Sequence, residues 1–377
     1  MHRRSLTTFL FVVSSAWCQP QVLVTGLQGP HKIILTPRGN LLVSETSMEP
    51  NAGRISFVTR SGTRRSLFEG LPSGTEVTLA GGGGPSALAL RERTLYVAMG
   101  AGDSERRGPS PGTSIHNPVG ASSPLFAAIL EVRFNEDVDS ISGVFRMTPE
   151  HQWVLADGGE VELSGDGAGR ARVSVLTRFP ISEPHPARLY RFSNLWGLAL
   201  SDDGSSLYVA DASMDSLARV ETATGRWRRL VRFPPIQNTG TIGPPVIDSV
   251  PTSVRIYGDQ LLVSFLSGFP FNRGSAHVRV VNPQTGVSEQ FMYDLTSVTD
   301  VLWRSRPNAR PQFFVLEFSA NQSAQPSPPG RLLRFDTAEA QVAAAGLITP
   351  VSMAFDESTQ DLYILELRGQ ILRLRLE

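Results

Sequence analysis

The sequence predicts an all-β protein, folded as a six-bladed β-propeller. Two observations carry this prediction. A unit of four short strands recurs with a period of about 50 residues, which is a spacing of propeller blades, whereas helical spacing of apolar residues is weak throughout. The last unit lacks its fourth strand, and an unpaired strand stands ahead of the first unit, as expected of a ring closed by its own chain end.

Each unit opens with Pro or an equivalent residue at the start of an alternating strand. A turn with Gly or Asp follows, and then an apolar strand of the form Leu-Tyr-Val or Leu-Leu-Val, which often ends in a small or acidic residue. In the first unit these features are Gly29-Pro30, the turn 37–40 and the strand Leu41–Glu45. The corresponding apolar strands of the later units are 95–99, 207–211, 261–265, 313–317 and 362–366.

The unpaired strand is the segment Gln21–Leu27, which resembles the fourth strands of other units, such as Ser66–Leu71. The printed chain ends at Glu377, directly after the third strand of the sixth unit. We therefore expect Gln21–Leu27 to complete the last blade, so that the ring has no open sheet edge at that point.

Two segments exceed the period. Residues 100–125 are rich in Gly, Ser and Pro, and we expect a long loop inside the second blade. Residues 150–190 contain the strand-like stretches 160–163 and 172–176, which would form either a hairpin insertion on one face or a degenerate seventh blade. The insertion is favoured, because the segment lacks the opening Pro and the Tyr-Val phrase. Residues 19–377 are expected to form a single domain.

Residues 1–18 have the order of a secretory signal peptide: a positive start, the apolar run 6–13 and the small residues 14–16. The run is shorter than the ~20 residues of a transmembrane helix. A lipid anchor at Cys18 would need a small residue before it, and Trp17 stands there instead. We expect a secreted or periplasmic mature chain with no membrane span and, once Cys18 is removed, no cysteine.

The charges exclude one class of partner and restrict one class of chemistry. The chain has 35 basic and 35 acidic residues, dispersed along its length, so it offers no basic patch for nucleic acid. Lys32 is the only lysine, so any Schiff-base or Ser–Lys chemistry is limited to that one residue.

The opening of each innermost strand gives one set of candidate residues, near a mouth of the central channel where propeller ligands bind. His31, Lys32, Trp196, Thr252 and Asp300 are predicted to form a polar and aromatic ligand pocket there. The alternative is structural: the hydroxyls bond the backbone of neighbouring blades, and Trp196 packs in the core. The residues at the strand openings are His31, Ser86, Trp196, Thr252, Thr299 and Val351.

The end of each second strand gives another set, and four of its six members are acidic. Carboxylates favour calcium or magnesium, which bind oxygen ligands. A structural role is the favoured alternative, because a side chain that repeats in successive blades can accept hydrogen bonds from the backbone of the following loop. The set consists of Glu45, Met99, Asp211, Phe265, Glu317 and Glu366.

The fourth unit carries the most distinctive phrases. Asp248–Val254 leads to Ser267–Phe271, and related phrases stand at Leu207–Ala212 and Thr296–Val301. Together they resemble the ScyD/ScyE family of secreted bacterial propeller proteins over most of the mature chain. The resemblance implies export and a six-bladed propeller of NHL-like or gluconolactonase-like type. It implies no established reaction.

A metal-dependent lactonase or ester hydrolase of the gluconolactonase type is the main alternative function. Such enzymes hold one divalent ion with a Glu, an Asn and an Asp, and the ion activates water. Glu45, Asn194 and Asp300 are the nearest matches by position in the blades, with calcium as the expected ion. The Pro-Asn-Gly and Pro-Asp-Gly contexts of those enzymes are absent here.

The sequence therefore predicts a non-catalytic ligand-binding or scaffold protein, with no cofactor and with an unidentified small molecule or protein as its partner. The hydrolase with its calcium site is one alternative. A protein-interaction platform that uses the rim of the propeller and residues 150–190 is the second.

Overall fold

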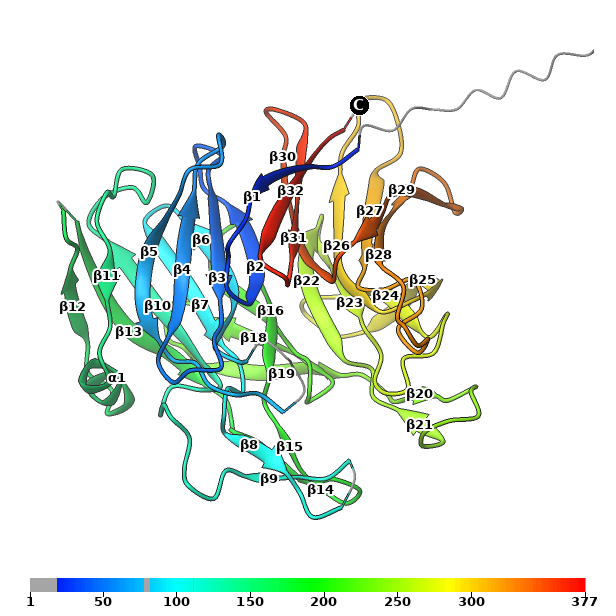
Figure 1. Ribbon diagram of the computed structural model, residues 1–377, viewed down its shortest axis with the longest axis horizontal. Coiled ribbons are helices and arrows are strands. Elements are labelled where there is room, and N and C mark those ends of the chain that lie inside the picture. The colour runs from blue at the N-terminus through cyan, green and yellow to red at the C-terminus, as the bar shows by residue number, and fades with distance from the viewer. Residues whose placement is uncertain (1–18, 78–81, 111, 168, 377) are drawn as a thin grey trace, which may run out of the picture.

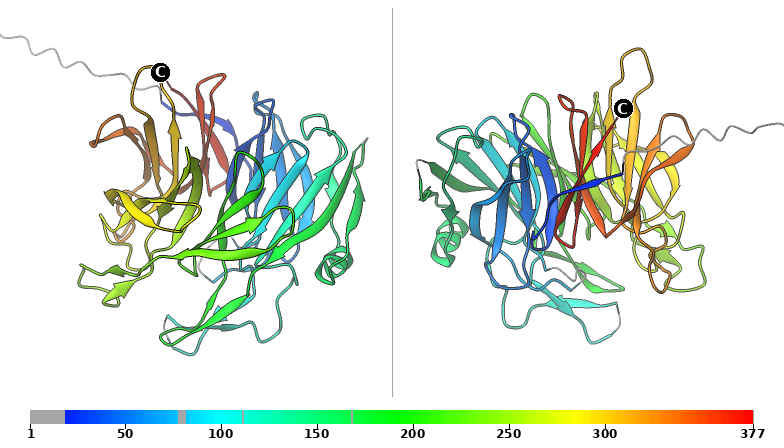
Figure 2. Two further views of the ribbon diagram at one scale, coloured as in Figure 1. Left: turned by 180° about the vertical axis from the view of Figure 1, so that it is seen from behind. Right: turned by 45° about the horizontal axis from the view of Figure 1, so that its top comes forward.

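The computed structural model describes residues 19–77, 82–110, 112–167 and 169–376. In this part of the chain one helix, α1 (Pro149–Ala156), stands among many strands. Six sheets of four or five strands lie side by side around a central axis (Figure 1, Figure 2). The described helix is too short to cross a membrane.

We call these six sheets blades I to VI and give their strands from the inside outwards. Blade I consists of β2 (Pro30–Leu35), β3 (Leu41–Glu45), β4 (Gly53–Val58), β5 (Arg64–Leu71) and β11 (Phe145–Arg146). Blade II consists of β6 (Pro85–Arg91), β7 (Thr94–Met99), β10 (Ala128–Phe134), β13 (Arg170–Arg178) and β12 (Val161–Ser164). Blade III consists of β16 (Leu195–Leu200), β17 (Ser206–Asp211), β18 (Ser216–Glu221) and β19 (Trp227–Arg232). Blade IV consists of β22 (Pro251–Tyr257), β23 (Gln260–Phe265), β24 (Ala276–Val281) and β25 (Ser288–Leu295). Blade V consists of β26 (Val298–Arg304), β27 (Gln312–Glu317), β28 (Gly330–Phe335) and β29 (Ala340–Leu347). Blade VI consists of β30 (Pro350–Asp356), β31 (Asp361–Glu366), β32 (Gln370–Arg375) and β1 (Gln21–Val24).

The innermost strands form a closed ring. They contact one another in the order β2, β6, β16, β22, β26 and β30, and β30 contacts β2 again. The buried apolar side chains of the described residues divide into six clusters, one at each interface between neighbouring blades. Leu42 of blade I and Leu88 of blade II share one cluster, for example, and Ile33 of blade I and Val351 of blade VI share another. The β-propeller class predicted from the sequence is confirmed.

The N-terminal strand completes the last blade, as the sequence predicts. β1 pairs with β32 in antiparallel register, with Val22 opposite Leu372. Beyond the strand, the Leu27 amide donates to the Gly369 carbonyl oxygen at 3.0 Å. Position 369 requires glycine, because its φ is +101° and a Cβ there would lie 2.2 Å from the Leu27 oxygen. Leu27 is 5% exposed and joins the cluster between blades VI and I.

The segment 150–190 differs from its prediction as an insertion or a seventh blade. β13 is an outer strand of blade II, paired along its length with β10, and β12 extends the same sheet. The opening Pro and the Tyr-Val phrase mark the two inner strands of a blade, which are buried on both faces. An outer strand carries no such motif. The absence of the motif from 172–176 is therefore compatible with an outer strand of blade II.

The long connections lie on the face of the ring where the innermost strands begin, which we call the loop face. Residues 100–125, predicted as a loop, contribute β8 (Glu105–Arg107) and β9 (Ser114–His116). These pair with β14 (Ser182–His185) and β15 (Leu189–Phe192) in an additional sheet. A hairpin of β20 (Ile236–Gln237) and β21 (Val246–Ile247) lies on the same side, at the bottom of Figure 1.

Ring closure makes a testable prediction. The substitution Leu27→Ala is expected to lower the free energy of unfolding by about 2–4 kcal/mol, because it leaves a cavity between blades VI and I. Deletion of residues 21–27 is expected to destabilise the protein severely, because it also exposes the edge of β32. Urea unfolding of the mature chain measures both effects.

The matched control is Val22→Ala, because Val22 lies in the same N-terminal segment as Leu27 but is 57% exposed. Its effect is expected to stay within about 0.5 kcal/mol. A deletion variant with the unfolding midpoint of the full chain would contradict closure by β1.

Candidate functional site

A β-bulge stands at the second residue of every innermost strand. In each blade the pairing with the second strand shifts register there, as between Pro30 and Lys32 in blade I and between Val298 and Asp300 in blade V. Bulges re-aim side chains and are frequent next to active sites. The bulged residues are those predicted from the strand openings: His31, Ser86, Trp196, Thr252, Thr299 and Val351.

Three of these bulged residues join neighbouring blades through their hydroxyl groups. Each hydroxyl contacts the carbonyl oxygen of the residue that opens the next innermost strand, at 2.9 Å for Thr252 and 3.0 Å for Thr299. Ser86 makes the same contact with blade III. Val351 packs in the cluster between blades VI and I. The structural alternative therefore describes Thr252, which has no further polar group to offer a ligand.

His31 and Trp196 break this pattern. Their rings lie 4.7 Å apart with an interplanar angle of 36°, although one belongs to blade I and the other to blade III, so they meet across the channel mouth. His31 is 2% exposed, and its Nδ1 has no hydrogen-bond partner among the described residues. Burial, together with the charge of Lys32, lowers the pKa of His31 to about 3, so the ring is neutral at physiological pH.

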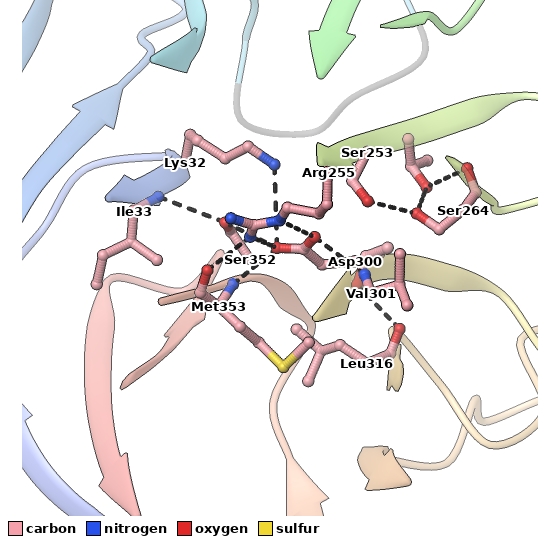
Figure 3. A network of polar contacts seen from close by, with 12 residues as sticks. Lys32, Ile33, Ser253, Arg255, Ser264, Asp300, Val301, Leu316, Ser352 and Met353 are labelled. Carbon is pink, nitrogen blue, oxygen red and sulfur yellow. Dashed lines mark hydrogen bonds and ion pairs between the residues drawn. The ribbon is translucent and has the colours of Figure 1, made fainter. Parts of the chain in front are cut away.

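Asp300 is the centre of an ion cluster inside the channel (Figure 3). Its carboxylate is fully buried and accepts two hydrogen bonds from Arg255, at 3.2 Å from Nε and 2.6 Å from Nη2. The backbone amide of Met353 donates at 2.9 Å, and the Ser352 hydroxyl lies 3.2 Å away. The Lys32 ammonium lies 3.9 Å from Oδ2. One carboxylate therefore connects blades I, IV, V and VI.

The surroundings keep this carboxylate charged. Burial alone would raise the pKa of Asp300, but the charges of Arg255 and Lys32 and the hydrogen bonds from Arg255 and Met353 outweigh it and hold the pKa below its usual value. Asp300 is therefore ionised at neutral pH, and it functions as the counterion of two cations.

The Lys32 side chain makes fewer polar contacts than the Asp300 carboxylate. Its Nζ lies near the Asp300 carboxylate at 3.9 Å, and among the described residues it makes no hydrogen bond. Its side chain is 5% exposed. Burial lowers the pKa of Lys32 to about 8; Asp300 opposes this shift, and Arg255 adds to it. With Lys32 protonated, the buried cluster contains two positive charges and one negative charge.

The three residues considered for calcium lie in separate networks. The Glu45 carboxylate accepts from the Gln28 amide at 2.6 Å and pairs with Arg64 at 3.0 Å. The Asn194 Nδ2 donates to Glu76 at 2.7 Å. Asp300 is neutralised by cations, which would repel a metal ion. The described residues include no group of three or more His, Cys, Asp and Glu placed to hold a metal. The predicted ligand set does not fit calcium.

The acidic residues at the ends of the second strands have the structural role that the sequence favoured. Each accepts a hydrogen bond from a backbone amide that stands just before an innermost strand, which holds the entry to that strand in place. The donating amide lies in the loop before the innermost strand in all four cases, and Asp211 also accepts from the Met214 amide, at 3.2 Å, in the following loop that the sequence predicted. The pairs are Gln28 to Glu45 at 2.6 Å, Asn194 to Asp211 at 2.9 Å, Thr296 to Glu317 at 2.8 Å and Ile348 to Glu366 at 2.6 Å.

The sequence reasoning missed Arg255 and Glu76. Arg255 interrupts the apolar innermost strand of blade IV, and a charge in a strand buried on both faces requires a partner, so that signal was available. Glu76 binds Asn194 from a connecting loop. A loop has no periodicity, so no pattern in the sequence could have pointed to that contact.

Comparisons with known proteins support the fold alone. No protein-family model matches the chain, and no curated protein sequence is similar to it. An auxiliary nutrient binding protein from Bacteroides thetaiotaomicron is similar over 92% of this chain and 69% of its own, with a TM-score of 0.50 and 8% identity. Streptogramin B lyase matches over 93% of this chain and 94% of its own, with a TM-score of 0.46 and 13% identity. Hydrazine synthase of Kuenenia stuttgartiensis matches over 93% and 76%, with a TM-score of 0.45 and 14% identity.

The ion cluster predicts a large effect of Asp300→Asn. The amide cannot neutralise Arg255 and Lys32, so the free energy of unfolding is expected to fall by about 3–5 kcal/mol. Chemical denaturation at pH 7 measures it. Asp202→Asn serves as the control, because Asp202 lies in an exposed turn. Equal effects of the two substitutions would contradict the central role of Asp300.

Lys32→Met is expected to act in the opposite direction. Lowering the pKa of Lys32 from 10.5 to about 8 makes its protonation in the folded state unfavourable by about 3 kcal/mol at pH 7. The variant should therefore be more stable than the wild type by about 1–3 kcal/mol, since Asp300 keeps Arg255 as its partner.

The same substitution has a pH signature. Between about pH 8 and 10.5 the folded chain has released the Lys32 proton and the unfolded chain has not, so this group makes stability rise with pH. The stability difference between Lys32→Met and the wild type should shrink across that window. A difference that is constant from pH 7 to pH 10.5 would contradict a lowered pKa.

Proposed function

We propose that this chain is an exported, non-catalytic ligand-binding β-propeller that binds its ligand at the channel mouth on the loop face. One observation carries the proposal. The other bulged residues join neighbouring blades by a hydrogen bond or by apolar packing. His31 and Trp196 instead form a ring pair across the mouth, with 4.7 Å between the ring centroids. A structural feature repeats with the blades, whereas a binding site needs different groups from different blades. Trp196 is partly exposed, so part of its aromatic surface is accessible to a ligand.

The state of the carboxylates favours binding over hydrolysis. A metal-dependent hydrolase needs carboxylates that are free to take a divalent ion. Glu45 and Asp300 are paired with Arg64 and Arg255 instead. Asn194, the third member of that set, donates to Glu76. We therefore propose no metal-dependent reaction at these residues.

The proposal includes export, because residues 1–18 have the order of a secretory signal peptide. These residues lie outside the described part of the chain. We propose a secreted or periplasmic location for the mature chain. Membership of the ScyD/ScyE family, suggested by the phrases around Pro251 and Pro270, agrees with both export and the absence of an established reaction for that family.

A protein-interaction platform is the second candidate function, and exposed apolar side chains favour it. Ile242 and Phe269 are 66% and 61% exposed, on connections of the loop face next to blade IV. The Asn272 side chain donates to Asn238 at 2.7 Å and holds these two connections together. Clustered exposed apolar residues are typical of protein-binding surfaces.

The proposal predicts ligand-dependent stabilisation that requires the ring pair. Thermal unfolding of the wild type is measured with a panel of monosaccharides, lactones and aromatic acids. A compound that raises Tm of the wild type should raise Tm of Trp196→Leu much less, because the substitution removes the accessible ring. Trp153→Leu is the control, since Trp153 is 61% exposed on α1, at the rim.

Two outcomes would contradict the proposal. Stabilising compounds that act equally on Trp196→Leu and on the wild type would place the site elsewhere. Calcium-dependent turnover of a lactone or ester, abolished by EDTA and by Glu45→Gln, would show that the protein is an enzyme.

A further inference from the structure

Lys32 is unusual both in the chain and in its site. It is the only lysine among 35 basic residues, so every other cationic position is occupied by arginine. It lies on β2 at the channel mouth, directly after the bulged His31. An ammonium group has three N–H donors. Those of Lys32 make no hydrogen bond within the described residues, and its one ion pair is long, at 3.9 Å.

The groups around Lys32 have unused donors but few free acceptors. Asp300 is surrounded by Arg255, Ser352 and Met353, which occupy both carboxylate oxygens. His31 Nδ1 is buried and has no partner among the described residues, while Nε2 lies 3.4 Å from the Thr46 hydroxyl. In the tautomer in which Nε2 accepts from Thr46, the neutral ring donates from Nδ1. Buried donors without acceptors are rare in folded proteins, and they mark places where a further group is expected to bind.

The charge balance defines that group. Lys32 and Arg255 contribute two positive charges, and Asp300 contributes one negative charge. A buried cluster with an excess charge is unfavourable, and a single anion would neutralise it. His31 directly precedes Lys32 on β2, and its ring contacts that of Trp196, which is partly exposed and offers a flat apolar surface at the same mouth. A small carboxylate with a flat substituent combines these properties: two acceptor oxygens, one negative charge and an apolar body.

We infer that Lys32 and His31 form the anchor of a site for a small carboxylate, whose apolar part packs against Trp196. This inference rests on the proposed ligand-binding function and names the chemical class of the ligand. The carboxylate oxygens accept hydrogen bonds from Lys32 Nζ and from the His31 ring. Asp300 and Arg255 hold Lys32 from the inside of the channel.

The single lysine allows a direct test. Protein labelled with 15N at the lysine side chain gives one ammonium signal, that of Lys32. Its titration is followed with sodium benzoate, with benzamide as the uncharged equivalent, and with sodium chloride at the same ionic strength. Benzoate should move the signal and raise the pKa of Lys32 by about one unit or more, because the bound anion stabilises the ammonium. Benzamide and chloride should leave it unchanged.

Two variants complete the test. Lys32→Met, which is expected to fold, should weaken benzoate binding at least tenfold in calorimetry. Trp196→Leu should discriminate by shape: it should weaken the binding of benzoate more than that of acetate. The exposed Trp153→Leu should behave as the wild type with both anions.

The outcomes separate this inference from the proposed function. A ligand that depends on Trp196 but leaves the Lys32 signal unchanged would overturn the carboxylate site and preserve the binding function. An equal response to chloride and to benzoate would show a general anion effect and overturn the carboxylate assignment. Benzoate affinity that is unchanged in Lys32→Met would overturn it as well.

Discussion

Closure of the ring is the constraint on which the other features of this protein depend. The apolar core is divided into clusters between neighbouring blades, so each blade is stable only because it is covered on both sides. A linear array would leave two blades with an uncovered apolar face. The pairing of β1 with β32 joins the start of the described chain to its last blade and thereby gives the first and last blades their common cluster. The described chain contains no cysteine, so this closure is non-covalent.

Closure also determines the chemistry of the channel. The six innermost strands contact one another in a ring, and five of their six bulged residues are buried, so water cannot freely solvate a charge in the space that they line. A charge in that space needs a partner from another blade. Asp300 meets this requirement for Arg255 and Lys32, and its bond from the Met353 amide adds blade VI. The ion cluster therefore adds polar connections across the ring to the apolar contacts around it.

The sequence predicted the features that repeat and missed those that do not. The propeller class, the residues at the strand openings and the closing strand follow from periodicity, which is local information, whereas the bulges at those openings were not predicted. The exception among the strands is β13, because an outer strand has no distinctive phrase. The sequence placed Lys32 and Asp300 in one predicted pocket, but it did not predict their ion pair between blades I and V, because a repeat does not show which side chains meet across the channel. The pocket of His31, Lys32, Trp196, Thr252 and Asp300 stays a prediction; the structure brings His31 to Trp196 and Lys32 to Asp300, and it gives Thr252 a structural contact.

The positions that depart from the repeat carry the argument for function. Ser86, Thr252 and Thr299 show one structural use of a bulged position, a hydroxyl that joins the next blade, and Val351 shows another, apolar packing between blades. His31 and Trp196 make a ring contact in place of such a hydrogen bond, and the cation of Lys32 lies where burial disfavours a charge. All three are at one mouth of the channel, on the face that also carries the additional sheet and the β20–β21 hairpin. Residues that reduce stability at one place, in a ring that otherwise repeats its stabilising contacts, are expected where a protein binds its ligand, because selection for binding tolerates a local loss of stability.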